Sequence, residues 1–77
     1  MSETFCVYQF FANDVGYEKV AQYVPPEEAI RIYNELVSSL GATIGTTEKI
    51  IITDGFDLTV LEWQYDKGIV FPPELNK

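Results

Sequence analysis

The sequence predicts an α+β fold, in which an antiparallel sheet of four to five strands carries one helix packed on one face. Two pairs of apolar segments, rich in β-branched and aromatic residues, are each joined by a short polar turn. One amphipathic segment lies between the two pairs, so the expected order is β-β-α-β-β. The chain has 77 residues, too few for a second core, and we expect a single domain over residues 1–77.

The first hairpin is expected within residues 4–24. Residues 4–11 are mostly β-branched or aromatic, which is typical of a strand, and residues 13–16 supply the polar residues and glycine of a turn. Residues 17–24 are long enough to pair back on the first strand. Pro25 and Pro26 end this pairing, because proline has no backbone N–H to donate.

A helix is predicted over residues 26–40. Pro26 suits the helix start, and Glu27 and Glu28 complement the positive end of the helix dipole. Apolar residues at three- and four-residue spacing give the helix one core-facing side, made of Ala29, Tyr33, Leu36, Val37 and Leu40. We expect Gly41 to end the helix in the left-handed conformation and residues 42–47 to form a loop.

The second hairpin is predicted from strands over residues 48–53 and 58–65. Asp54 and Gly55 between them are typical of a hairpin turn. Residues 66–68 allow another tight turn, after which residues 69–71 are expected to form a short edge strand. Pro72 and Pro73 end its pairing.

Both faces of the expected sheet are apolar, which a single helix does not explain, because such a helix covers only part of the sheet. A second copy of the chain, stacked face to face, is the simplest cover for the remaining face, so we expect a homodimer. The alternative is that the loops and residues 71–73 cover this face within one subunit. The candidate interface consists of Tyr8, Phe10, Leu61, Trp63 and Tyr65.

Three acidic residues make a candidate polar site, namely Asp54, Asp57 and Glu62. Asp54 and Asp57 flank a glycine as ligands of a hard cation do, but the stretch lacks the spacing of a calcium loop, so the turn interpretation is favoured. Glu62 stands between two apolar residues, where loss of solvent suits a carboxyl group to acid–base chemistry or to ligand binding. Alternatively, Glu62 faces solvent or pairs across the sheet with Lys49.

The composition narrows the classes of function. The chain has no histidine, which removes the usual general base and the commonest metal ligand, and we expect no enzymatic activity, metal or cofactor. The single cysteine, Cys6, cannot form an internal disulfide and favours a cytoplasmic protein. The net charge of −7 repels phosphates and anionic lipids, so we expect no direct binding to nucleic acid or membranes.

The C-terminal half of the chain carries a resemblance. Residues 51–55 are Ile-Ile-Thr-Asp-Gly, residues 62–63 are Glu-Trp and residues 68–72 are Gly-Ile-Val-Phe-Pro. In these residues the chain resembles short uncharacterised proteins of bacterial and phage genomes. The resemblance rests on turn and core residues and implies an accessory protein of mobile or regulatory character, without catalytic residues.

We therefore predict a small, acidic, non-enzymatic protein that binds another protein through an apolar and aromatic sheet face. Its acidic rim favours a partner with a basic surface. Two further hypotheses stay open. The first is a small-molecule-binding protein or minor enzyme with a pocket near Glu62 and Trp63. The second is an acidic inhibitor of a nucleic-acid-binding protein, which requires carboxylates clustered on one face.

Overall fold

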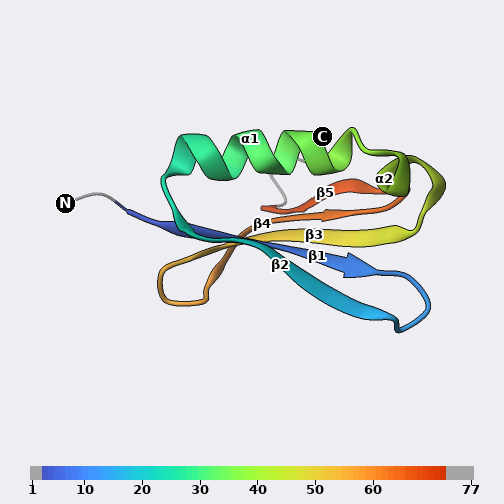
Figure 1. Cartoon of the computed structure of the whole chain (residues 1–77), viewed down its shortest axis with the longest axis horizontal. Coiled ribbons are helices and arrows are strands. Elements are labelled where there is room, and N and C mark those ends of the chain that lie inside the picture. The colour runs from blue at the N-terminus through green and yellow to red at the C-terminus, as the bar shows by residue number, and fades with distance from the viewer. Residues whose placement is uncertain (1–2, 73–77) are drawn as a thin grey trace.

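Five strands within residues 3–72 form one antiparallel sheet in the spatial order β2-β1-β3-β4-β5. The structure is a computed structural model that describes residues 3–72. Its elements are β1 (Phe5–Phe11), β2 (Gly16–Val24), α1 (Pro26–Val37), α2 (Leu40–Ile44), β3 (Thr47–Asp54), β4 (Thr59–Gln64) and β5 (Gly68–Phe71). Figure 1 shows α1 lying across one face of the sheet. The α+β class and the antiparallel sheet predicted from the sequence are confirmed.

The expected β-β-α-β-β order is wrong in its helical part, because a second, short helix separates α1 from β3. With the fifth strand, which was expected at the edge, the order is β-β-α-α-β-β-β. α1 ends at Val37 rather than at residue 40, and part of the expected loop over residues 42–47 belongs to α2. Leu40, which the sequence placed on the core side of one long helix, begins α2 and is 73% exposed.

Ser39 and Gly45 define the bounds of α2. The Ser39 hydroxyl donates to the Leu36 carbonyl at 2.6 Å and accepts from the Ala42 backbone N–H at 3.3 Å, so it closes α1 and caps the start of α2. Gly45 has a φ of 92° and ends α2 in the left-handed conformation. Gly41 was expected to end the long helix in this conformation, but the left-handed glycine is Gly45, and it ends α2 rather than α1.

The outer side of α1 carries an ion-pair cluster. The Arg31 guanidinium donates to both carboxylate oxygens of Glu28 and, at 2.7 Å, to Glu35. These pairs span one helical turn and are exposed, so water screens them and each contributes little to stability. The hydrogen bond from Arg31 lowers the pKa of Glu28 below its usual range.

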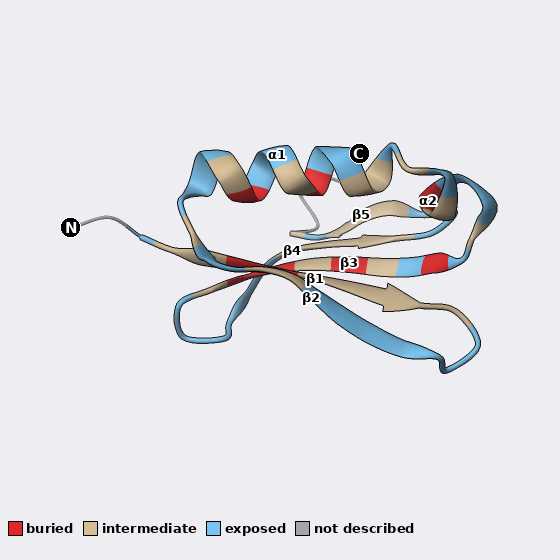
Figure 2. Ribbon diagram, in the orientation of Figure 1, coloured by how far each residue is buried: buried red, intermediate tan, exposed pale blue. Residues whose placement is uncertain are grey.

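The hydrophobic core lies between α1 and the central strands β1 and β3. Figure 2 shows buried positions on these strands and on the side of α1 that faces them. The core is formed by Val7, Ala29, Tyr33, Ile50 and Ile52. Full burial of one such aliphatic side chain stabilises the fold by about 1.5–3 kcal/mol relative to exposure. Burial also raises the pKa of Tyr33, because a phenolate is poorly solvated there.

The two predicted hairpins are confirmed, since β1 pairs with β2 and β3 pairs with β4. β5 is an edge strand, as expected, and ends at Phe71. Pro73, which was expected to end this pairing together with Pro72, lies outside the described residues. Within residues 3–72, no helix is long and apolar enough to cross a membrane.

Candidate functional site

The register of the strands separates the sheet into two faces. Directly opposed residues of neighbouring antiparallel strands point to the same face. Val7 lies opposite Ile52, which lies opposite Leu61, and all three belong to the core or pack against it under α1. Tyr8, one residue further along β1, therefore points to the other face, which no helix described by the structure covers (Figure 1).

We call this uncovered surface the open sheet face. Two regular rows of opposed residues cross it from β2 through β1 and β3 to β4. The first row is Lys19, Tyr8, Ile51 and Glu62, and the second row is Tyr17, Phe10, Lys49 and Gln64. The strands are regularly paired between the two rows, so the eight side chains stand on one continuous surface of the sheet.

Aromatic rings cluster at the β1–β2 side of the open sheet face. The ring of Tyr17 stacks on Phe10 with a centroid distance of 5.3 Å and an interplanar angle of 29°. It also lies 6.1 Å from the ring of Tyr8 at a tilt of 60°. Tyr17 is nevertheless 62% exposed, so a large apolar ring is held in place while most of it stays in water.

Two lysines lie over these rings. The Lys49 Nζ lies 4.7 Å from the centroid of Phe10, and the Lys19 Nζ lies 5.7 Å from the centroid of Tyr8. Both distances suit cation–π attraction, which holds each ammonium near the sheet rather than extended into solvent. In a chain with a net charge of −7, this face thus concentrates positive charge next to aromatic surface.

The structure does not bring the five predicted interface residues together. Tyr8 and Phe10 lie on the open sheet face, whereas Leu61 and Trp63 pack against the core on the α1 side. Tyr65 follows β4, and its ring lies beside Gly45 at the end of α2. Tyr17 was not among the predicted residues, although its alternation with Lys19 in β2 was a usable signal.

The three predicted polar residues also separate. Oδ1 of Asp54 accepts the backbone N–H groups of Phe56 and Leu58, at 2.8 and 3.0 Å, so Asp54 builds the β3–β4 turn. Asp57 is exposed in the same turn with a φ of 64°. Glu62 lies on the open sheet face and accepts a hydrogen bond from Gln64 Nε2 at 2.7 Å.

One alternative paired Glu62 with Lys49 directly across the sheet. In the structure the residue opposite Lys49 is Gln64. A metal site at the three acids gains no support either. Within residues 3–72, no group of three potential metal ligands gathers closely enough to hold an ion.

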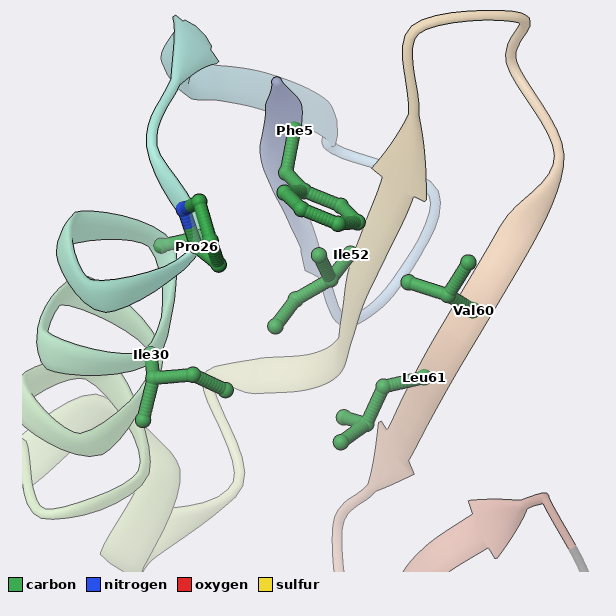
Figure 3. Close-up of a pocket in the computed structure, with 7 residues that line it drawn as sticks. Phe5, Pro26, Ile30, Ile52, Val60 and Leu61 are labelled. Atoms are coloured by element: carbon green, nitrogen blue, oxygen red, sulfur yellow. The ribbon is translucent and has the colours of Figure 1, made fainter. Parts of the chain in front are cut away.

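An apolar groove of about 200 Å³ lies between the start of α1 and strands β3 and β4 (Figure 3). It is lined by Phe5, Pro26, Ala29, Ile30, Ile52, Val60 and Leu61. Specific ligand pockets are larger and add a few convergent polar groups to an apolar wall. The groove supplies no such side chain, and Glu62 is on the opposite face of the sheet from Leu61.

Comparisons with known proteins do not indicate a function for this chain. No family model, curated protein or solved structure matches the chain. The candidate site therefore has to be judged from its residues alone.

The described carboxylates are distributed over several elements. Glu28 and Glu35 are held by Arg31 on α1, Asp54 is used in a turn, and Glu18 accepts from Gln9 at the sheet end. Imitation of nucleic acid requires carboxylates arrayed on one surface. This distribution gives no support to the hypothesis of an acidic inhibitor.

Proposed function

We propose that this protein is a non-enzymatic protein-binding module whose docking surface is the open sheet face. The stacked pair of Phe10 and exposed Tyr17 carries the proposal. Aromatic side chains that are rigid before binding provide large contact area at a low entropic cost, and they dominate the energetics of protein interfaces.

The charges of the open sheet face indicate the chemistry of the partner. Lys19 and Lys49 stand over aromatic rings, and Glu62 stands at the other end of the first row. A complementary surface carries apolar groups opposite the rings and at least one carboxylate opposite a lysine. This differs from the basic partner that the net charge alone favours.

A catalytic role is not part of the proposal. Glu62 is the one carboxylate in the two rows of the open sheet face, and its described partner is the Gln64 amide. On an uncovered sheet, water screens such a group, whereas acid–base catalysis uses a positioned group within reach of a substrate. A cytoplasmic location is part of the proposal and is supported by the free, buried thiol of Cys6.

A second class of partner uses the same kind of surface. Proteins that bind single-stranded nucleic acid stack bases on aromatic rings beside cations. The net charge of −7 opposes the approach of a phosphate backbone, so a protein partner is favoured.

A photo-crosslinking side chain at position 17 tests the proposal, with the same side chain at position 34 as the control. Asn34 is exposed on α1, on the covered side of the sheet, so both sites are accessible. Irradiation in the cell that makes the protein is expected to give a discrete polypeptide adduct from position 17 and none from position 34. Ile51→Ser, which removes an apolar contact from the same face, is expected to weaken that adduct while the circular dichroism stays unchanged.

Absence of an adduct at position 17 contradicts the proposal, as do equal adducts at both positions. An adduct with an oligonucleotide assigns the face to nucleic acid instead.

A further inference from the structure

We infer that the occupant of the open sheet face is a second copy of this chain. The two sheets stack face to face about a twofold axis that runs parallel to the strands between β1 and β3. This inference rests on the proposed function and names its partner. It is carried by the self-complementarity of the two rows on the open sheet face.

Symmetry determines which residues meet. An axis parallel to the strands and midway between β1 and β3 exchanges β1 with β3 and β2 with β4, while each row keeps its height along the strands. The first row of one subunit therefore faces the first row of the other in reverse order. The same holds for the second row. Aligned sheets stack about 10 Å apart, a distance that long side chains from both sides bridge.

In the first row, this operation places Lys19 opposite the partner's Glu62 and Tyr8 opposite the partner's Ile51. An ammonium meets a carboxylate, and an aromatic ring meets an aliphatic side chain. Because the interface is isologous, each contact forms twice.

In the second row, Phe10 faces the partner's Lys49 and Tyr17 faces the partner's Gln64. The ammonium of Lys49 already lies 4.7 Å from the Phe10 ring of its own subunit, so it lies between two rings in the dimer. The Tyr17 hydroxyl meets an amide that both donates and accepts. No like charges oppose each other in either row.

Two other twofold axes lack this complementarity. An axis along β3 sets Lys49 opposite the partner's Lys49 and Tyr8 opposite the partner's Glu62. An axis perpendicular to the strands, which exchanges the two rows, sets Glu62 opposite the partner's Gln64 and leaves the carboxylate without a cation. The first arrangement opposes like charges, and neither places a lysine opposite Glu62, so both lack the ion pairs of the proposed dimer.

The net charge does not forbid this dimer. Glu28 and Glu35 lie on α1, on the far side of each sheet from the interface, and both are held by Arg31. Charges separated by two stacked sheets lie beyond the screening length of about 8 Å at physiological salt.

Lys19 and Glu62 make a clean test, because they do not touch within one chain. They stand on β2 and β4 with two strands between them, three strand spacings or about 14 Å apart. That distance also exceeds the screening length of about 8 Å. Energetic coupling between these two positions therefore reports a contact between subunits.

The experiment measures the dimer dissociation constant by sedimentation equilibrium for the full chain and its variants. The wild-type chain is expected to approach twice 8.8 kDa as its concentration rises. Lys19→Glu and Glu62→Lys each place like charges in both symmetric contacts, so each is expected to raise the dissociation constant about tenfold or more. The double variant restores opposite charges and the original net charge, and its constant is expected to return to within about threefold of the wild type.

Glu27→Lys is the control for Glu62→Lys, because it makes the same charge change at an exposed position of α1 and is expected to leave the constant unchanged. A wild-type chain that stays monomeric overturns the inference, and so does a dimer that the single variants do not weaken or the double variant does not restore. A monomer that still crosslinks another protein from position 17 leaves the proposed function standing. A chain without any adduct at that position overturns both.

Discussion

Gly45 packs directly against the ring of Tyr65. A Cβ placed on Gly45 would lie 3.1 Å from both Cε2 and Cζ of that ring, closer than ordinary van der Waals contact. The end of α2 and the residue that follows β4 therefore approach each other only because position 45 has no side chain. The φ of 92° adds a second requirement for glycine at the same place.

Gly45→Ala is expected to destabilise the protein by about 2–4 kcal/mol, because left-handed strain and a close ring contact add together. Gly68→Ala is the matched control, since Gly68 also has a positive φ, of 79°, but a Cβ there meets nothing within 4 Å. That control is expected to lose only about 1–2 kcal/mol. Urea unfolding measures both, and equal losses would show that the Tyr65 ring moves aside freely.

Thr53→Val is expected to stabilise the protein by about 1 kcal/mol. The Thr53 Oγ1 is buried and, among the described residues, has no hydrogen-bond partner, so an isosteric methyl group removes a desolvation cost. Thr47→Val in the same strand is the opposite case, because the Thr47 hydroxyl donates to Gln9 Oε1 at 2.7 Å. It is expected to destabilise by about 1–2 kcal/mol. Shifts of both urea midpoints in the same direction would contradict this interpretation.

Glu28→Gln is expected to remove part of the acid dependence of stability. Because Arg31 lowers the pKa of Glu28 in the folded state, its contribution is present above the pKa of the unfolded chain and is lost as the pH falls through the folded pKa. Unfolding measured from pH 7 down to pH 2 should show the wild type more stable than Glu28→Gln at neutral pH. The difference between their free energies of unfolding should shrink as the pH falls. Glu27→Gln removes a carboxylate that lies in the same first turn but does not bind Arg31. Its free energy of unfolding at neutral pH should differ less from that of the wild type.

Tyr33→Phe is expected to make the protein more resistant to alkali. Burial raises the pKa of Tyr33, so its contribution is complete below the unfolded pKa of about 10 and is lost as the pH rises through the folded pKa. The variant lacks this ionisation and should retain its free energy of unfolding above pH 10. Tyr23→Phe, at an exposed position, should behave like the wild type. A wild type and a Tyr33→Phe variant with superimposable alkaline profiles would argue against the buried phenol.

The sequence predicted the parts of the fold that depend on neighbouring residues. Both hairpins and the start of the helix at Pro26 follow from turn residues and proline chemistry. The break near Ser39 did not follow, because residues 26–40 continue an apolar helical period and both Gly41 and Gly45 are able to stop a helix. The capping hydrogen bond of Ser39 was the missing signal, and serine is common in many other contexts.

The candidate interface was predicted less well, for a geometric reason. Alternation within one strand assigns residues to two faces, but it does not say which face of one strand continues into which face of another. The order β2-β1-β3-β4-β5 and the register decide this, and they place Tyr8 in line with Glu62 rather than with Trp63. Strand order is a tertiary property that no local pattern in β1 or β4 contains.

The ladder between β1 and β3 runs from the pair of Phe5 and Asp54 to the pair of Phe11 and Thr47. Within residues 3–72, every other strand pairing joins strands that are consecutive along the chain. The molecule therefore consists of two locally organised pieces, and closing the long loop between them should limit the folding rate. It also makes the protein a natural candidate for fragment complementation. A backbone cut between Ser38 and Ser39 yields two peptides that recognise each other through this one ladder and through the packing of α1 against β3 and α2.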